Sequence, residues 1–227
     1  MLDEIAEMDN TARMNSRHYS ALDHLVMNFD QAVRTLAGKP LVTERPDPAA
    51  DQVQPDLSDA EKAESVRLMR VNHSGEVAAQ ALYQGQALTA RLDTVRDRME
   101  LAAREENDHL EWCGRRVREM GGRLSYLNPA WYLGSMAIGA AAGAIGDKWS
   151  LGFVAETERQ VVSHLDEHLQ RLSPNDRKGR AVLEQMKIDE ARHGASAKAA
   201  GGVELPVPVK KLMRLSSRIM TRIAYWI

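Results

Sequence analysis

Residues 189–193 read Asp-Glu-Ala-Arg-His, and they decide the fold because their pattern has a counterpart elsewhere in the chain. Glu190 and His193 are three positions apart, so on a helix their side chains project from the same face. The same Glu-x-x-His spacing recurs at Glu106 and His109. We therefore expect two helices that turn these faces toward each other.

Each Glu-x-x-His pattern follows a helical segment that carries one further glutamate. Glu76 lies 30 residues before Glu106, and Glu158 lies 32 residues before Glu190. Two such helix pairs, packed antiparallel, would gather four carboxylates and two imidazoles inside a bundle, which is the ligand set of ferritin-like di-iron carboxylate proteins. The sequence thus predicts an all-α fold: a ferritin-like four-helix bundle with a crossover helix, plus an N-terminal helix and a C-terminal amphipathic helix.

Two iron ions per subunit suit this set of side chains. Iron in such sites takes hard oxygen donors with some imidazole, and four carboxylates balance the charge of two ferrous ions. A single Glu-x-x-His is usually a solvated helix face, but two copies with matching upstream glutamates predict a metal site. The predicted ligands are Glu76, Glu106, His109, Glu158, Glu190 and His193. Spacing leaves open which carboxylates bridge the irons; by symmetry with known sites of this type, Glu106 and Glu190 are the candidates.

Five further residues are candidates for supporting roles. Asp189 and Arg192 are expected behind the ligands, because a ligating histidine usually donates its other N–H to an acid or a carbonyl. Tyr83 lies on the same helical stripe as Glu76. His73 and His164 are close in sequence to ligands and are candidates to tune or gate the site. For each of these two, a hydrogen-bonded core or surface histidine is an equal alternative.

Start and stop signals place the four bundle helices. Ser58 and Glu61 have the spacing of a capping box, which predicts a helix from Ser58 to about Ala90. The other three are expected at about 92–120, 150–172 and 177–200, and glycine pairs end the second and the fourth. The short connection at 91–93 favours antiparallel neighbours over one long bent helix.

The remaining segments divide the chain into three expected units: residues 1–57, 58–205 and 206–227. Apolar residues at helical spacing predict a helix over 17–36, and four prolines between residues 39 and 57 predict a linker or an extended strap. Ala130–Gly146 carries no charge, but it is short and weakly apolar for a membrane span. A buried or interfacial crossover helix is favoured over a true span.

The segment Pro206–Ile227 is basic and amphipathic. Its basic residues are Lys210, Lys211, Arg214, Arg218 and Arg222, and it contains no acidic residue. Its other face is apolar, which is typical of a helix that lies in a membrane interface. Docking of this helix on the bundle, or on a second subunit, is the alternative.

Composition and charge exclude several classes of protein. The formal net charge of −2 provides no global field for nucleic acid. The single cysteine, Cys113, excludes an internal disulfide and fits a reducing compartment. The acidic segment Met1–Asn10 fits neither a secretory signal nor a mitochondrial presequence, so a cytoplasmic, bacterial location is expected.

Three stretches resemble the demethoxyubiquinone hydroxylases, or 3-demethoxyubiquinol 3-hydroxylases, of ubiquinone biosynthesis. They are Arg-Val-Asn-His-Ser-Gly-Glu at 70–76, Glu-Asn-Asp-His-Leu at 106–110, and the stretch at 189–193. The resemblance covers about 57–227, and the helix that begins at Arg17 resembles the bacterial branch. One departure is Thr157-Glu158-Arg159, where the family often has paired acids; it leaves Glu156 as a rival of Glu158 for the third-helix ligand.

The resemblance implies a monooxygenase in which two ferrous ions reduce dioxygen and the ring of a polyprenyl quinol or quinone is hydroxylated. Electrons would come from NADH, directly or through the quinone, although the sequence holds no glycine-rich dinucleotide fingerprint. The substrate's isoprenoid tail lies in the bilayer. The family likeness therefore implies a peripheral protein on the cytoplasmic face of the bacterial inner membrane, docked through Pro206–Ile227, with Ala130–Gly146 as a second candidate contact.

Other functions compete with this one. An iron-storing ferritin-like protein fits poorly, because a closed shell has little place for the linker and the basic tail. Another di-iron oxidase without quinone hydroxylation remains the main alternative, although a single cysteine excludes the cysteine-rich module of rubrerythrin-like proteins. A non-catalytic member of a biosynthetic complex is a further alternative. The sequence leaves a homo-oligomer or a complex with other proteins open.

Overall fold

The computed structural model describes residues 21–37, 39–43 and 45–227. These residues form seven helices, and no β-strand occurs among them. The predicted start of the first helix at Arg17 and the acidic segment Met1–Asn10 lie outside the described residues. The expectation of an all-α fold is confirmed.

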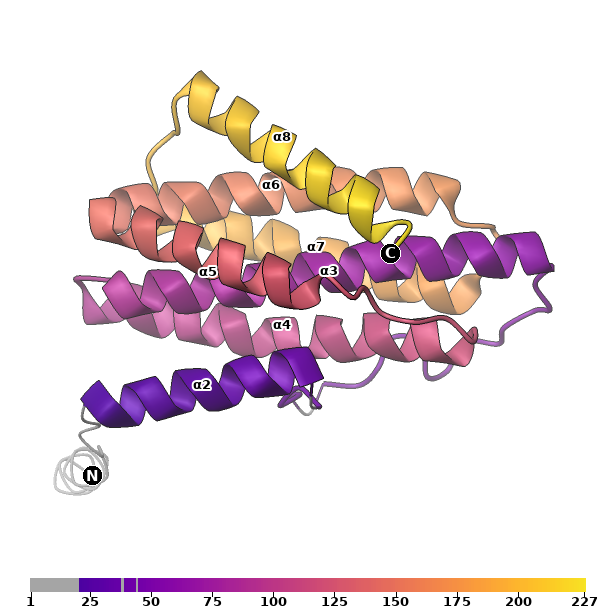
Figure 1. The fold of residues 1–227 in the computed structure, drawn as a ribbon. Coiled ribbons are helices and arrows are strands. Elements are labelled where there is room, and N and C mark those ends of the chain that lie inside the picture. Colours follow the sequence, from indigo (N-terminus) through magenta and orange to yellow (C-terminus); the bar gives the residue numbers. More distant parts are fainter. Residues whose placement is uncertain (1–20, 38, 44) are drawn as a thin grey trace, which may run out of the picture.

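Four long helices form the bundle, and a fifth crosses between the two pairs (Figure 1). The first pair is α3 (Asp59–Thr89) and α4 (Asp93–Glu119), and the second is α6 (Asp147–Arg171) and α7 (Arg177–Ala199). The helices of each pair pack against each other, and α5 (Asn128–Ile145) packs along α3. This arrangement of pair, crossover and pair is the predicted one.

Local signals explain where the bundle helices begin and end. Ser58 and Glu61 form a reciprocal capping box: the Glu61 amide donates to Ser58 Oγ at 3.3 Å, and the Ser58 amide donates to Glu61 Oε2 at 2.8 Å. Gly121 follows α4 with a φ of 72°, and Gly201 follows α7 with a φ of 100°. Glycine adopts this left-handed conformation without the steric cost of a Cβ atom.

The connection between α3 and α4 lies beside the connection between α5 and α6. The Asp147 carboxylate accepts hydrogen bonds from the backbone amides of Arg91 and Leu92, each at 3.0 Å. The Arg91 guanidinium donates to the Ala144 carbonyl at 3.0 Å. These contacts fix a tight turn at 90–92, so α3 and α4 are antiparallel neighbours rather than one bent helix.

The described residues of the proline-rich segment, 39–43 and 45–57, form an ordered strap rather than a loose linker. The Thr43 amide donates to Asp108 Oδ1 at 2.7 Å, and the Arg45 guanidinium reaches the same carboxylate at 2.7 Å. Farther along, Asp47 pairs with Arg115 at 3.0 Å. The strap thus joins the outer face of α4 to α2 (Ala21–Ala37), which lies outside the bundle (Figure 1).

The crossover helix α5 approaches α3 very closely. A Cβ atom added to Gly139 would collide with the Leu82 carbonyl oxygen, so only glycine permits this packing. On its other side α5 exposes Leu133, Ile138 and Ile145. Among the described residues, no helix has the length and apolar character that crossing a membrane requires.

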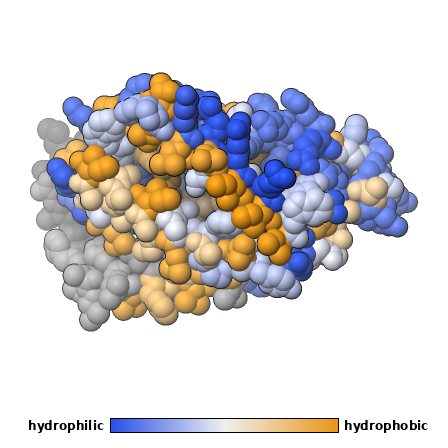
Figure 2. All heavy atoms as spheres, turned by 45° about the horizontal axis from the view of Figure 1, so that its top comes forward, coloured by the Kyte–Doolittle hydropathy of each residue, from blue (hydrophilic) through white to orange (hydrophobic). Residues whose placement is uncertain are grey.

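The basic helix α8 (Val207–Ala224) docks on the bundle, where it contacts α3 and α6. Ala224 is fully buried, and the Arg70 guanidinium donates to the Tyr225 carbonyl at 3.3 Å. Three large apolar residues of α8 stay exposed: Leu212, Leu215 and Ile219 are 67%, 56% and 51% exposed. Figure 2 shows apolar side chains gathered on the side of the molecule where α5 and α8 lie.

A seven-residue spacing on each bundle helix places one buried glutamate between two apolar layers. The four series are Met69, Glu76, Tyr83; Met99, Glu106, Cys113; Leu151, Glu158, Leu165; and Leu183, Glu190, Ala197. Seven residues are about two helical turns, so each series lies on one face. The four glutamates therefore meet at one level of the bundle interior.

Candidate metal centre

Six side chains from all four bundle helices meet at this level. Helix α3 contributes Glu76, α4 contributes Glu106 and His109, α6 contributes Glu158, and α7 contributes Glu190 and His193. None of them is more than 9% exposed. The structure thus brings together every side chain that was predicted as an iron ligand.

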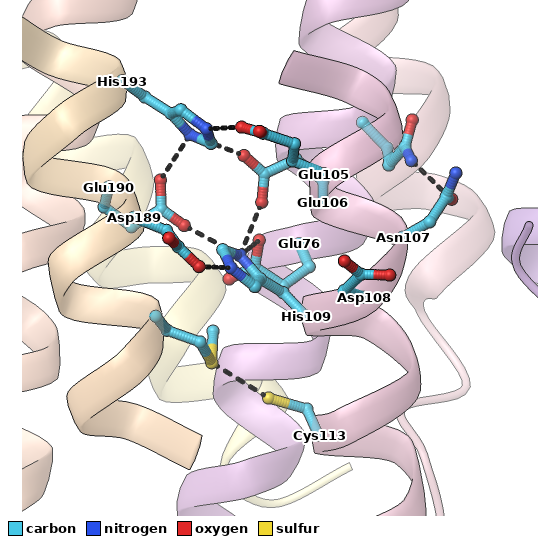
Figure 3. Close-up of polar contacts among 12 residues, drawn as sticks. Glu76, Glu105, Glu106, Asn107, Asp108, His109, Cys113, Asp189, Glu190 and His193 are labelled. Atoms are coloured by element: carbon cyan, nitrogen blue, oxygen red, sulfur yellow. Dashed lines mark hydrogen bonds and ion pairs between the residues drawn. The ribbon is translucent and has the colours of Figure 1, made fainter. Parts of the chain in front are cut away.

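Glu106 and Glu190 lie between the two imidazole rings (Figure 3). His109 Nδ1 is 2.9 Å from Glu106 Oε2 and 3.1 Å from Glu190 Oε1. His193 Nδ1 is 3.2 Å from Glu106 Oε1 and 3.5 Å from Glu190 Oε2. Each carboxylate therefore turns one oxygen toward each histidine, which is the arrangement that a bridging carboxylate requires.

The other two glutamates flank this central pair. Glu76 Oε2 is 3.7 Å from His109 Nδ1, and one ligand atom from each of Glu76, Glu106, His109 and Glu190 lies within 4.8 Å of all the others. Glu158 accepts a hydrogen bond from the Tyr83 hydroxyl. Glu158 also lies close enough to Glu190 and His193 for their charges to act on it. Each imidazole thus has one outer glutamate near it.

The two histidines are oriented by acids that come from the opposite motif. His109 Nε2 is 3.1 Å from Asp189 Oδ2, and Asp189 directly precedes Glu190. His193 Nε2 pairs with Glu105, which directly precedes Glu106. Each motif therefore supplies the acid that holds the other motif's histidine (Figure 3). Such contacts fix the ring so that its remaining nitrogen can bind a metal.

Sequence reasoning missed Glu105, although a signal for it was present. Both motifs have an acid directly before the glutamate, Glu105-Glu106 and Asp189-Glu190. Only the second of these acids was predicted to act behind the ligands. Arg192, also predicted, lies 3.2 Å from both Glu105 and Asp189, so it contacts the two orienting acids rather than a ligand.

Arg45 of the strap is a second residue that sequence reasoning missed. Its guanidinium is 2.8 Å from Asp189 Oδ2 and 2.7 Å from Asp108 Oδ2, and it lies over the Trp112 ring at 5.1 Å. Burial opposes the ionisation of Asp189, but His109 and Arg45 offset this effect and lower the pKa of that carboxyl. The strap therefore contributes directly to the surroundings of His109.

The carboxylates and imidazoles perturb one another strongly. Burial, with the charges of neighbouring carboxylates, raises the pKa of Glu76 and of Glu158 well above the ordinary value. Burial also disfavours ionised Glu106 and Glu190, but the two histidines offset this effect and lower both pKa values. Burial opposes the charged histidine as well, yet these carboxylates raise the pKa of His193 to about 12. Without a metal, protons supply the positive charge that the carboxylates require.

Several buried polar atoms of this cluster lack a hydrogen-bond partner among the described residues. They are Glu106 Oε1, both carboxylate oxygens of Glu190, and His193 Nδ1. Some of these atoms are within ion-pair distance of each other but do not have hydrogen-bond geometry. Unpaired buried polar atoms are costly and rare. Oxygen and imidazole donors that converge in this way fit metal ions.

The other histidines named above lie apart from the cluster. His73 is 3.4 Å from the Asn128 side-chain amide, and burial lowers its pKa to about 4. His164 Nε2 is 3.1 Å from Ser217 Oγ. No hydrogen bond or ion pair joins either of them to the six clustered side chains within the part of the chain that the structure describes. Glu156, the rival of Glu158, is instead bound by Arg159 at 2.7 Å.

A small opening between α4 and α7 leads to the cluster. Its volume is about 160 Å³, and its walls are mostly apolar, with Met99, Leu101 and Ala102 from α4 and Leu151 and Val154 from α6. Tyr83, Glu105 and His193 also line it. A cavity of about 150 Å³ is large enough to bind benzene. The opening is therefore of a size to admit one ring.

This fold and this cluster define a class of protein: a helical bundle with a buried centre of carboxylates and imidazoles suited to binding metal. A scan of family models narrows the class. The family described as Ubiquinone biosynthesis protein COQ7 matches residues 63–224, and the chain belongs to this family.

Relatives named 3-demethoxyubiquinol 3-hydroxylase match almost the whole chain. The chain is 60% identical to one from Nitrosococcus oceani over 214 residues, which are 94% of this chain and 100% of the relative. It is 58% identical to one from Nitrosomonas europaea, with 91% and 99% covered, and 52% identical to one from Coxiella burnetii, with 94% and 99% covered. The family resemblance inferred from the three motifs is confirmed.

Proposed function

We propose that this chain is a 3-demethoxyubiquinol 3-hydroxylase, an oxygen-dependent monooxygenase of ubiquinone biosynthesis. The proposal is carried by the buried cluster of four glutamates and two histidines, one of which, His193, lines a small opening between α4 and α7. It is supported by the relatives of that name, which match the chain almost from end to end. A cluster with this composition suits oxygen chemistry at a metal.

Two iron ions are the proposed cofactor. Glu76 with His109, and Glu158 with His193, would hold one iron each, and Glu106 and Glu190 would lie between the irons because each faces both imidazoles. When bound, the irons supply the activation of dioxygen. Asp189 and Glu105 keep Nε2 of His109 and of His193 engaged, so Nδ1 of each ring stays directed into the cluster.

The opening between α4 and α7 is the proposed route of the quinol ring. Its volume of about 160 Å³ is below the roughly 300–1,000 Å³ of pockets that enclose a whole ligand. The ring can therefore enter while a long isoprenoid tail stays outside. Met99, Leu101 and Ala102 would present apolar surface to the ring, and Tyr83, which also lines the opening, donates its hydroxyl hydrogen bond to Glu158.

NADH is the proposed source of electrons, passed either directly or through the quinone. A single-turnover assay with chemically reduced protein tests hydroxylation without NADH, so it tests the reaction separately from the electron source. Iron-loaded protein is reduced chemically, given a demethoxyubiquinol and labelled dioxygen, and the product is analysed by mass spectrometry. One labelled oxygen on the ring is expected. Repeating the assay with NADH as the only reductant tests the electron source.

Glu190→Gln and Glu184→Gln provide a matched pair of variants on α7. Glu190 is in the cluster, whereas Glu184 is exposed on the same helix and only pairs with Arg180 at 3.9 Å. Labelled ring product is expected from the Glu184→Gln variant and not from the Glu190→Gln variant. Oxidation of iron by the unmodified protein without any ring product would favour the alternative, a di-iron oxidase or iron-binding protein.

The membrane surface is the proposed location of the protein, on the cytoplasmic face of the bacterial inner membrane. Support comes from the exposed apolar residues of α8, Leu212, Leu215 and Ile219, which accompany a basic stripe. Helix α5 also exposes Leu133, Ile138 and Ile145, and Figure 2 shows apolar side chains gathered on the side of the molecule where α5 and α8 lie. A tail that remains in the bilayer needs a protein that rests on it. We also propose that residues 1–57, 58–205 and 206–227 are the three units of the chain.

Flotation with lipid vesicles tests the membrane proposal. The double variant Leu215→Glu and Ile219→Glu places charge on the apolar face of α8, so it should remain at the bottom of the gradient. Ile188→Glu is the control, because Ile188 is also an exposed apolar residue, at 63%, but lies on α7. Equal flotation of both variants would contradict a role of α8 in docking.

A further inference from the structure

A second cavity is larger than the opening at the candidate metal centre. It lies between α6 and α8, with Val71 of α3 at its wall, and has a volume of about 660 Å³. This volume is within the roughly 300–1,000 Å³ of small-molecule sites. None of the six clustered glutamates and histidines lines it. A molecule bound in this cavity would therefore contact none of the proposed iron ligands.

The cavity is strongly basic. Arg159 and Arg171 line it from α6, and Arg214, Arg218 and Arg222 line it from α8. Glu167 is the one carboxylate in the lining, and its side chain is 66% exposed. The chain as a whole has a net charge of −2, so the positive charge is concentrated at this place.

The three α8 arginines repel one another, and this repulsion destabilises the helix. Arg214, Arg218 and Arg222 are spaced four residues apart, so their like charges lie above one another on one face. Arg159 and Arg171 have acidic partners, Glu156 and Glu64. Within the described part of the chain, no ion pair joins any of the three α8 arginines to an acid. Their charge is thus left for a bound anion.

Neutral donors and aromatic rings complete the cavity. Gln160 and Ser163 line it from α6. At the end near the C-terminus are Tyr225 and Trp226, and the Arg171 guanidinium lies over the Tyr225 ring at 5.0 Å. Arginine guanidinium groups bind phosphate oxygens through pairs of parallel hydrogen bonds, which is why clustered arginines recognise phosphate.

We propose that the cavity between α6 and α8 binds a phosphate-bearing anion, held chiefly by Arg214 and Arg218 on one wall and by Arg159 and Ser163 on the other. A soluble compound with a diphosphate group and the head group of an anionic phospholipid share this chemistry. They differ in how the anion arrives, from solution or from a bilayer, and the experiment separates them.

The test compares two double variants of the full chain that lose the same charge. Arg214→Gln with Arg218→Gln removes two arginines of the cavity. Arg177→Gln with Lys211→Gln removes two exposed basic residues outside it, one of which is also on α8. Circular dichroism and thermal melting verify that both variants fold like the unmodified chain.

Inorganic pyrophosphate, titrated by calorimetry, tests the soluble source. The unmodified protein and the control variant should bind it equally, and the cavity variant should bind it at least about tenfold more weakly, because charge-assisted hydrogen bonds are lost. Vesicles of phosphatidylcholine with and without phosphatidylglycerol test the lipid source. The expected result is a gain in binding from phosphatidylglycerol that the cavity variant loses and the control variant keeps.

Each combination of results decides the proposal. Selective loss with pyrophosphate supports it and assigns a soluble ligand. Selective loss with phosphatidylglycerol alone supports it and assigns a lipid head group. Equal losses in the two variants, or no binding of either probe, would overturn it, since general charge attraction would then explain the data. Hydroxylation is not measured, so failure of the proposed function leaves this test intact.

Discussion

At the scale of single residues, the candidate metal centre depends on partners that come from distant segments. His109 is held by Asp189, and Asp189 is held in turn by Arg45 of the strap. The clustering of the six glutamates and histidines could be predicted because helical spacing determines which side chains share a face. Arg45 could not be predicted, because nothing in the spacing of an irregular segment determines which helix it lies against.

Arg45→Met is expected to weaken both the fold and the metal centre. It removes a cationic partner that the buried carboxylates of Asp108 and Asp189 share, which should lower the free energy of unfolding by about 2 kcal/mol or more. Because Asp189 then orients His109 less firmly, metal affinity should fall by about 10- to 100-fold. Urea unfolding and metal titration measure the two effects.

Arg115→Met is the matched control for this prediction. Arg115 also ties the strap to α4, through Asp47 at 3.0 Å, but its side chain is 47% exposed and it has no contact with the metal centre. Exposed ion pairs contribute about 1 kcal/mol or less, so both effects should be small. If the two variants lost metal affinity equally, the strap as a whole, rather than Arg45, would orient the site.

His168 makes the stability of the protein depend on pH. Its Nδ1 is 2.8 Å from Asn72 Oδ1, and burial, together with the charges of His164 and Arg171, lowers its pKa to about 3 from the ordinary 6.5. Between these values the unfolded chain binds a proton that the folded chain does not, so folding stability falls as the pH falls below 6.5.

Removing this histidine should flatten the acid side of the stability profile. In His168→Gln the loss of unfolding free energy between about pH 7.5 and pH 5.5 should be smaller than in the unmodified protein by about 1.4 kcal/mol. Urea unfolding of the metal-free proteins at both pH values gives the comparison. An unchanged slope would mean that His168 is already protonated in the native protein.

At the scale of helices, the sequence predicted most boundaries to within a few residues because the signals are local. Ser58 with Glu61 starts α3, and Gly121 and Gly201 follow α4 and α7. The third bundle helix begins at Asp147 instead of the expected Ser150. The Asp147 carboxylate accepts hydrogen bonds from backbone amides of the α3–α4 turn, and this contact accounts for the earlier start. Contacts of that kind join segments that are distant in sequence, so no local pattern reveals them.

The close contact of α5 with α3 predicts opposite effects for two glycine substitutions on α5. In Gly139→Ala the added methyl group would collide with the Leu82 carbonyl, so the free energy of unfolding should fall by about 1–3 kcal/mol. In Gly134→Ala the methyl group meets no atom within 4 Å, and the better helix propensity should raise stability by about 0.5–1 kcal/mol. Urea midpoints measure both. Equal effects would contradict the close packing.

At the scale of the whole molecule, the helical bundle and its buried glutamates could be predicted from one repeated pattern. The same pattern did not predict the direction in which the apolar face of the C-terminal helix points. Periodicity identified both faces of α8, but the face that meets the bundle depends on the complementary surface of α6 and α3. The structure turns Ser217 and Ala224 inward and leaves Leu212 and Leu215 exposed.

Metal binding should stabilise the entire fold, because the ligands come from all four bundle helices. Anaerobic loading with ferrous iron should raise the melting temperature, by an amount equivalent to about 2.7 kcal/mol when free iron is 100 times its Kd. A chelator should reverse the change. Glu106→Gln should abolish the shift, whereas Glu184→Gln should retain it. A shift that persisted in Glu106→Gln would place the bound metal elsewhere.

Each motif supplies the acid that orients the histidine of the other motif, so the two parts of the centre depend on each other. Each helix pair carries one of the two clustered histidines, but the acid that contacts Nε2 of this histidine belongs to the other pair. A chain that lost one motif would also lose the acid that orients the histidine of the other motif. We therefore expect related chains either to keep both motifs or to lose both.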